Sequence, residues 1–304
     1  MLHAGNVSFS YGTGPGQTKG RAARPRSGPV SDGGDALAAG LHGVTIEIRS
    51  GSFVGVLGPN GSGKTTLLRV LAGLLQPSSG RVTLQGTDLR HFSRQRLARQ
   101  IAVVPQETHL AFEYSVLEVV LMGRYPHLGS FEIEGPRDLT IARQALAATG
   151  TSALEARPFG TLSGGEKQRV VIASALAQAA DIMLLDEPTA SLDLGYQLEI
   201  AALLRRLNLE RGITMVVATH DLNFAASICR ELVLLRSGRV LATGELSVAL
   251  TRELIRALYG VEADVQYHPS AGHLTVVATK RITGADSERG AETGAESPAL
   301  SPPS

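Results

Sequence analysis

Residues 58–66 form a nine-residue run whose residue types can bind a triphosphate. The run reads Gly-Pro-Asn-Gly-Ser-Gly-Lys-Thr-Thr and fits the pattern G-x-x-x-x-G-K-[ST]. Glycines let backbone N–H groups turn toward phosphate oxygens without steric cost. We expect the Lys64 ammonium to meet the β- and γ-phosphates and the Thr65 hydroxyl to bind Mg²⁺. The expected phosphate-binding residues are Gly58, Pro59, Asn60, Gly61, Ser62, Gly63, Lys64, Thr65 and Thr66.

The segments on either side of this run support a phosphate loop. Residues 53–57 are an apolar run that predicts a buried strand, and residues 66–71 predict a helix. A phosphate would then lie at the helix N-terminus, where unpaired N–H groups and the helix dipole favour anions. A plain glycine turn between a strand and a helix is the alternative. The Lys-Thr pair at the end of the run and the flanking elements argue against it.

Two carboxylates follow a second apolar run. Residues 182–185 predict a buried strand, and Asp186 and Glu187 come directly after it. Sheets of α/β proteins bind ligands at the carboxyl ends of their strands. We expect Asp186 to hold Mg²⁺ through water and Glu187 to accept a proton from an attacking water. An apolar run followed by two acids carries little information alone, but the upstream phosphate loop gives it meaning.

A third motif predicts a helix start with unusual glycines. Ser163 and Glu166 have the spacing of a capping box before a helix expected over residues 170–180. An ordinary helix start would explain this pattern. The two glycines between them, Gly164 and Gly165, would also make a second anion site. One triphosphate in the first loop would leave that second site without a purpose.

Taken together, these motifs resemble the ATP-binding-cassette (ABC) ATPases over about residues 5–265. Residues 162–168 are similar to the signature motif of that family. In that family two cassettes pair head to tail, and the signature of one caps the ATP held by the phosphate loop of the other. The resemblance therefore implies that Ser163, Gly164 and Gly165 contact the nucleotide of a partner chain.

The same resemblance assigns roles to four further residues. It implies that Tyr11 stacks on adenine and that Gln106 reaches Mg²⁺ and the attacking water. It places Asp193 in a loop, residues 191–193, that crosses the dimer interface. His220 would touch the γ-phosphate, although its position alone would also suit a strand-end histidine. The implied cofactors are ATP and Mg²⁺, with the metal held by Thr65, Gln106 and Asp186.

The implied fold is α/β: a P-loop NTPase cassette with a RecA-like core, an antiparallel β edge and a helical subdomain. We expect an ABC ATPase domain over residues 1–265, with a disordered insertion at 12–40 and the helical subdomain at 107–160. Residues 266–280 are expected to extend the cassette. Residues 281–304 are expected to form a disordered tail, since they are rich in polar residues and end in a Ser/Pro-rich sequence.

Composition limits the class of protein. The formal net charge of the 304 residues is +1, so no global field favours nucleic acid or an anionic membrane. The one cysteine, Cys229, excludes an intramolecular disulfide and is expected to be a buried, inert thiol in a reducing compartment. Neither a bilayer-spanning segment nor a secretory signal is evident. We expect a cytoplasmic protein whose membrane role comes through a partner.

Three classes of ATP-driven system fit the motifs: an importer subunit, an exporter subunit, and a soluble relative acting on DNA or ribosomes. The run Gly-Arg-Tyr-Pro-His at residues 123–127 resembles cassettes of iron–siderophore, haem and vitamin B12 importers. That resemblance implies an ATPase subunit that works as a homodimer on integral-membrane permease subunits at the cytoplasmic face of the membrane. A substrate-binding protein would act indirectly, and no nucleic acid is expected. Another importer, an efflux system and a soluble ATPase remain the alternatives.

Overall fold

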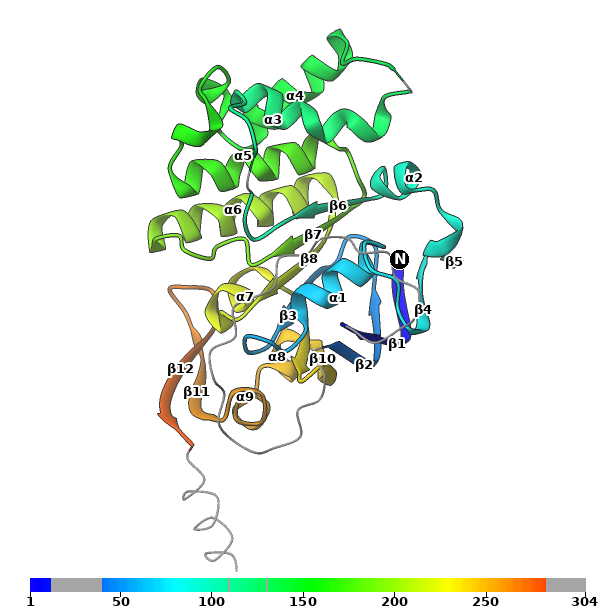
Figure 1. Cartoon of the computed structure of the whole chain (residues 1–304). Helices are drawn as coiled ribbons and strands as arrows, with labels where there is room; N and C mark the ends of the chain where they lie inside the picture. The colour runs from blue at the N-terminus through cyan, green and yellow to red at the C-terminus, as the bar shows by residue number, and fades with distance from the viewer. Residues whose placement is uncertain (12–39, 109, 130, 283–304) are drawn as a thin grey trace, which may run out of the picture.

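The computed structural model describes residues 1–11, 40–108, 110–129 and 131–282 (Figure 1). The expected insertion and tail therefore lie almost entirely outside the described residues. Two boundaries need correction. Gly40 belongs to a strand, not to the insertion, and Arg281 ends a strand where the tail was expected to begin. The described chain is an α/β structure, as the motifs predicted.

A six-stranded sheet forms the centre, in the order β10-β9-β3-β8-β7-β6. All neighbouring pairs are parallel except β9 with β10, which form an antiparallel hairpin. The strands are β3 (Phe53–Leu57), β6 (Ile101–Val104), β7 (Ile182–Asp186), β8 (Thr214–Thr219), β9 (Glu231–Arg236) and β10 (Arg239–Glu245).

The central strands are apolar throughout because both faces of the sheet are covered. In β8, Met215 and Val217 join the core on the helical side, whereas Val216 and Ala218 join the core on the other side. None of the four is exposed to solvent. An unbroken apolar run, not an alternating one, is therefore the correct sequence signal for these strands.

An antiparallel sheet of order β2-β1-β4-β5 covers one side of the molecule, and α1 (Lys64–Leu71) packs between it and the central sheet. Its first two strands pair from Leu2 with Ile48 to Ser10 with Gly40, so they adjoin despite the 28 residues between Tyr11 and Gly40 that lie outside the described part. The strands are β1 (Leu2–Ser10), β2 (Gly40–Ile48), β4 (Ser79–Leu84) and β5 (Thr87–Asp88), and α2 (Arg94–Ala98) leads from this sheet to β6.

The other side carries a helical layer (Figure 1). It contains α3 (Val116–Leu121), the 3-10 segment η2 (Met122–His127), α4 (Pro136–Ala148), α5 (Gly164–Ala177) and α6 (Leu194–Arg211). The predicted helical region, residues 107–160, ends too early in the sequence. The observed layer also includes α5, which packs against both α3 and α4 and shares their core. The predicted capping box is confirmed: Ser163 Oγ accepts from the Glu166 N–H at 3.3 Å, and the Ser163 N–H donates to Glu166 Oε2 at 2.8 Å.

The C-terminal part continues the same core. It consists of α7 (Leu222–Ile228), α8 (Leu246–Ala249), α9 (Arg252–Tyr259) and the hairpin of β11 (Val261–His268) with β12 (His273–Arg281). The expected boundary between residues 265 and 266 falls inside β11, and both strands contribute buried side chains to the core, Ala263 and Val276. Cys229 is buried, and this burial raises the pKa of its thiol. In the described ranges, the helices are too short or too polar to cross a bilayer.

Candidate functional site

The carboxyl ends of four adjacent parallel strands meet at one edge of the central sheet. The segment after β3 is the phosphate loop, and the segment after β6 carries Gln106. Asp186 ends β7 and Glu187 follows it, whereas His220 follows β8. Because β3, β8, β7 and β6 are neighbours in the sheet, residues distant in the sequence come together here.

The phosphate loop holds its lysine in a fixed cradle. Lys64 is 5% exposed, and its Nζ donates to the carbonyl oxygens of Gly58 at 2.9 Å and Pro59 at 3.2 Å. Gly58 must be glycine, because a Cβ there would lie 2.2 Å from the Leu235 carbonyl oxygen. Gly63 has a φ of 103°, a conformation that only glycine adopts readily. The loop backbone and the ammonium are thus set before a ligand arrives.

Helix α1 begins directly at Lys64 and leaves its N-terminus open to an anion. Gly63 is the N-cap and offers no side-chain hydrogen bond, and the first turn contains no acidic residue. The first N–H groups of a helix lack intrahelical partners and carry the positive end of the helix dipole. This end of α1 is therefore suited to phosphate oxygens.

A hollow of about 420 Å³ lies above the loop. Its walls combine the phosphate loop with residues from β2, from the segment after β6 and from the segment after β7. The lining residues are Gly40, Asn60, Gly61, Gly63, Lys64, Thr65, Thr66, Gln106 and Glu187. Gly40 was not expected here, because the sequence placed it in the insertion, and nothing local in the sequence signals its role.

Thr65 and Asp186 form the oxygen-rich side of the site. The Thr65 hydroxyl donates to Asp186 Oδ1 at 3.0 Å, which joins α1 to the end of β7. Asp186 is 8% exposed, and burial raises the pKa of its carboxyl; the adjacent Glu187 charge adds to this, while the Thr65 hydrogen bond opposes it. Gln106 lines the same hollow as Thr65, so this side of the site offers a carboxylate, a hydroxyl and an amide, the hard oxygen ligands that Mg²⁺ prefers. The residues present therefore fit a magnesium ion shared with phosphate oxygens.

The Glu187 carboxylate lies between Lys64 and His220. Its Oε1 is 3.5 Å from Lys64 Nζ, and its Oε2 is 3.2 Å from His220 Nδ1. The backbone of Glu187 has a φ of 47°, an uncommon conformation for a residue with a side chain. A hydrogen bond from its N–H to the Ala218 carbonyl, 2.9 Å long, holds this turn against β8.

Tyr11 reaches the same loop from the antiparallel sheet. Its hydroxyl lies 3.2 Å from Thr66 Oγ1, and its ring packs edge-on against Phe9 with 4.8 Å between the ring centroids. The residue is 50% exposed. The structure thus brings Tyr11 beside the phosphate loop, although Tyr11 is not among the residues that line the hollow.

The signature residues and Asp193 lie elsewhere, outside the lining of the phosphate-loop hollow. Ser163 and Gly164 are exposed at the start of α5, and a Cβ on Gly165 would lie 2.2 Å from the Tyr196 ring. Asp193 is the N-cap of α6, where its Oδ1 accepts from the Tyr196 N–H at 3.0 Å. These residues form a second exposed corner of the chain, built where α5 and α6 begin.

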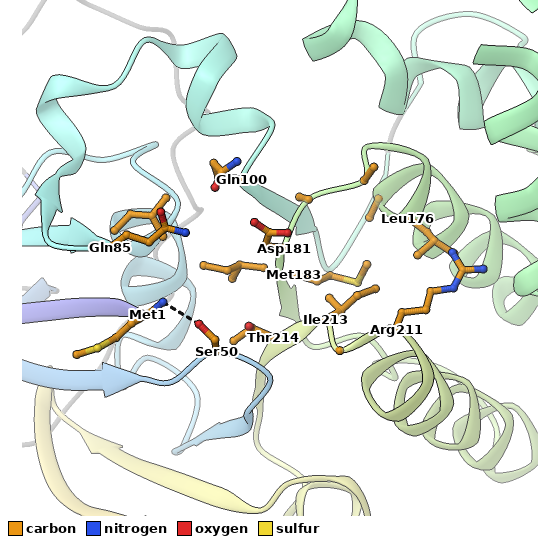
Figure 2. Close-up of a pocket in the computed structure, with 16 residues that line it drawn as sticks. Met1, Ser50, Gln85, Gln100, Leu176, Asp181, Met183, Arg211, Ile213 and Thr214 are labelled. Atoms are coloured by element: carbon orange, nitrogen blue, oxygen red, sulfur yellow. Dashed lines mark hydrogen bonds between the residues drawn. The ribbon is translucent and has the colours of Figure 1, made fainter. Parts of the chain in front are cut away.

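A second hollow, of about 410 Å³, has almost the same volume but lies away from the phosphate loop (Figure 2). It lies at the amino ends of the central strands, where Ile182 begins β7 and Thr214 begins β8. Figure 2 shows Gln100, Asp181 and Arg211 around it, and the Met1 nitrogen donating to Ser50 Oγ at 3.0 Å. No residue of the phosphate loop lines it. Volume alone therefore does not identify the nucleotide site, whereas strand polarity does.

The sequence also gave no sign of Tyr259 near the site. This residue ends α9, yet its hydroxyl donates to the His220 carbonyl oxygen at 3.2 Å. The contact depends on how the C-terminal part packs against β8, so no local motif could have revealed it.

Comparison with known proteins identifies the family of the chain. A family model described as ABC transporter matches residues 41–190. The hemin import ATP-binding protein HmuV of Gloeobacter violaceus is 44% identical over 239 residues, which cover 76% of this chain and 86% of that protein. The ferric enterobactin transport ATP-binding protein FepC of Escherichia coli K12 is 40% identical over 238 residues, covering 78% and 88%. The cobalamin import ATP-binding protein BtuD of Halobacterium salinarum is 43% identical, but the chain spans only 61% of its length.

Solved structures give the same result. A chain from a transporter described as metal-chelate type, in an inward-facing conformation, matches with a TM-score of 0.73 and 29% identity, covering 91% of this chain and 96% of that one. The ATP-binding cassette MJ0796, in a dimeric post-hydrolysis state bound to ADP and Pi, matches with a TM-score of 0.65 and 30% identity over 81% and 99%. The chain belongs to the ABC transporter family of ATP-binding proteins.

Proposed function

We propose that this chain hydrolyses ATP as the energising subunit of an importer for an iron–siderophore, haem or cobalamin. One observation carries the enzymatic part of the proposal. Glu187 lies between the buried ammonium of Lys64 and the imidazole of His220, at the edge of a hollow built by a phosphate loop. A carboxylate in that position can act on a water molecule beside the terminal phosphate.

Binding of ATP would use groups that are already in place. The N–H groups at the start of α1 and the Lys64 ammonium would meet the phosphates, and the Tyr11 ring would meet the adenine. Thr65, Asp186 and Gln106 would hold Mg²⁺, which when bound neutralises phosphate charge. Because the ammonium is buried and fixed by two carbonyls, little reorganisation is needed on binding, which favours electrostatic stabilisation of the transition state.

Hydrolysis would then proceed by one proton transfer and one displacement. Glu187 accepts a proton from the attacking water while the water oxygen bonds to the γ-phosphorus. The bond from that phosphorus to the bridging oxygen breaks, and ADP and phosphate leave. His220, within 3.2 Å of the Glu187 carboxylate, would orient this carboxylate and touch the γ-phosphate.

A head-to-tail pair of chains would complete the site. In one chain Ser163 and Gly164, which are exposed at the start of α5, do not line the phosphate-loop hollow, so a partner chain is needed for them to reach a nucleotide. Leu194 and Leu198, one turn apart on α6 beside Asp193, are 71% and 63% exposed. Such a pair of leucines is suited to burial against a second copy. ATP would then close the pair, and hydrolysis would let it open.

The import role is supported by the named relatives and by one surface. The relatives are ATP-binding proteins for hemin, ferric enterobactin and cobalamin. In this chain the aromatic residues Phe112 and Tyr125 are 74% and 56% exposed at the helical layer, close to residues that resemble those importers. This surface would receive permease subunits and place the chain at the cytoplasmic face of a membrane. Cassettes of other importers or of efflux systems are the second possibility.

The proposal is tested by capture from native membranes. A tagged Glu187→Gln chain is incubated with Mg-ATP and detergent-solubilised membranes, with Lys64→Ala as the nucleotide-binding control. We expect a polytopic permease of a metal-chelate or cobalamin importer to be recovered with Glu187→Gln and lost with Lys64→Ala. Recovery of an efflux permease would contradict import, and recovery of only soluble or nucleic-acid partners would contradict the transport role altogether.

A further inference from the structure

We propose that the C-terminal unit, defined as α9, β11 and β12 (residues 252–281), positions His220 through two contacts. Its Tyr259 side chain bonds to the histidine backbone, and its β12 backbone bonds to the Asn223 side chain on α7. Tyr259 is a positioning residue, because it contacts the histidine backbone and not the expected substrate. The inference rests on the proposed role of His220 in hydrolysis and adds a structural element that sets that role.

The first contact fixes the histidine itself. The Tyr259 hydroxyl donates to the His220 carbonyl oxygen at 3.2 Å. The phenol therefore joins the end of α9 to the segment that carries His220.

The second contact fixes the helix that follows the histidine. Asn223 lies in the first turn of α7, which Asp221 caps by accepting from the N–H groups of Asn223 and Phe224. The Asn223 side chain accepts from the Val276 N–H at 2.8 Å and donates to the Val276 carbonyl at 3.1 Å. Strand β12 thus pairs with an amide side chain as it would with another strand, and α7 lies against it (Figure 1).

The C-terminal unit packs on the core through α9, as a positioning element requires. Two half-exposed ion pairs, Arg252 with Asp264 at 2.8 Å and Arg256 with Glu262 at 3.3 Å, also join α9 to β11 but add little stability. Ile255 and Leu258 bury their side chains in the helical-side core, at 1% and 2% exposure.

The end of α9 is fixed as well. Gly260 ends the helix with a φ of 67°, and its carbonyl accepts from the Ile282 N–H at 2.9 Å after the hairpin returns. Burial raises the pKa of the Tyr259 phenol, so its hydroxyl keeps the proton that it donates to His220.

The test compares Tyr259→Phe with Tyr267→Phe, a control on the same unit whose side chain is 61% exposed. Phenylalanine keeps the ring and removes only the oxygen. We expect kcat for ATP to fall roughly two- to tenfold in Tyr259→Phe, the range expected for one net hydrogen bond. The ATP dissociation constant and the melting temperature should stay close to wild type, and Tyr267→Phe should keep the wild-type kcat. Asn223→Ala should reproduce the kcat loss.

A double-mutant cycle with His220→Ala separates this inference from the proposed function. If Tyr259 acts through the imidazole, Tyr259→Phe should cause no further loss in the His220→Ala background. An unchanged kcat in Tyr259→Phe, or losses that multiply in the double variant, would overturn the inference while leaving the ATPase intact. A wild-type kcat in His220→Ala would instead contradict the proposed role of His220, and this inference with it.

Discussion

Glu187 combines its chemical role with backbone strain. A residue other than glycine at a φ of 47° costs roughly 1–3 kcal/mol, which the surrounding structure must offset. The hydrogen bond to Ala218 does so by fixing the turn to β8. Ser191, at the loop before α6, has a similar φ of 62°. Five other non-glycine residues in the described part of the chain have a positive φ outside these segments, so the strain supports the proposed role of Glu187 only together with its contacts.

The buried carboxylate of Asp186 is expected to lower the stability of the folded protein when no cation is bound. Its carboxylate is buried beside Glu187 with one hydroxyl donor, so the charged form is disfavoured until a cation arrives. We predict that Asp186→Asn stabilises the nucleotide-free protein at neutral pH by about 0.5–2 kcal/mol, as replacements at strained functional sites often do. The measurement is thermal unfolding in EDTA, with Mg-ATP turnover expected to be lost in the same variant.

The pH dependence of that difference gives a sharper check. Because the folded-state pKa of Asp186 is raised, the cost in stability is complete above that pKa and disappears only below the unfolded-state pKa, where both states are protonated. The advantage of Asp186→Asn should therefore be complete at neutral pH and shrink as the pH falls toward the ordinary carboxyl value. An equal advantage at all pH values, or a less stable variant at neutral pH, would contradict this account.

At the residue scale, the sequence revealed the groups that lie in contiguous motifs. The phosphate loop, Asp186 and Glu187 could be assigned because each follows a recognisable buried strand. Gly40 and Tyr259 could not, because each reaches the site only through tertiary packing of a distant element. The role of the signature residues could be assigned only through a family resemblance, because an ordinary helix start with a capping box accounts for the same sequence.

At the element scale, η2 contacts both α4 and α5 within the helical layer. A Cβ on Gly123 would lie 2.1 Å from the Ser174 carbonyl oxygen, so η2 packs directly on α5. Arg124, 5% exposed, donates to Asp138 Oδ1 at 2.9 Å and to the Ala177 carbonyl at 2.7 Å. His127 contacts the Gln178 carbonyl at 2.8 Å. The Gly-Arg-Tyr-Pro-His run thus satisfies carbonyl groups at the C-terminal end of the helix that carries the signature.

We predict that Arg124→Ala destabilises the protein by about 3 kcal/mol, because it leaves a partly buried carboxylate unpaired and the end of α5 without its donor. Arg137→Ala, an exposed change next to Asp138 on α4, is the matched control and should be nearly neutral. Denaturant unfolding measures both. Hydrogen exchange should also show faster opening of α4 and α5 in Arg124→Ala. Equal stability of the two variants would show that the buried ion pair contributes little.

Element boundaries were predicted less well than element types. The strands β3, β7 and β8 follow from their apolar runs, whereas α5 begins six residues earlier than the predicted 170. The capping box predicted at Ser163 marks this start, but the two glycines in the first turn have poor helix propensity, so the helix was expected only from residue 170. The packing of Gly165 under Tyr196 overrides that propensity. The helical layer extends beyond residue 160 because α5 packs against α3 and α4.

At the scale of the whole molecule, the chain presents a nucleotide hollow and a separate exposed signature corner. We predict that Glu187→Gln with Mg-ATP sediments at twice the mass of one chain and that adding Gly164→Asp keeps it at the mass of one. Gly164 is exposed and a Cβ there meets only Leu192 at 3.4 Å, so the fold should tolerate the change. An acid in the first turn favours the helix but repels a partner's phosphate. A dimer that forms equally well with Gly164→Asp would contradict the head-to-tail arrangement.

The overall architecture could be predicted from the sequence because the motifs occur in a fixed order along a βα pattern. The position of the C-terminal part could not be predicted. Its boundary was placed inside β11, and its contact with His220 joins elements that are distant in the sequence. The identity of the transported substrate could be predicted from neither the sequence nor the fold, because the proposed role of this chain is to energise partners that would bind the substrate.

The most direct test of the central claim is steady-state ATP hydrolysis by Glu187→Gln beside the wild type, with ATP affinity measured on the same samples. Glu210→Gln, an exposed change at the end of α6, is the control. The account predicts that Glu187→Gln loses at least about 100-fold in kcat, the contribution of a positioned general base, while its ATP affinity and the kcat of the control remain close to wild type. Wild-type turnover by Glu187→Gln would show that Glu187 is not the base and would contradict the mechanism proposed for this site.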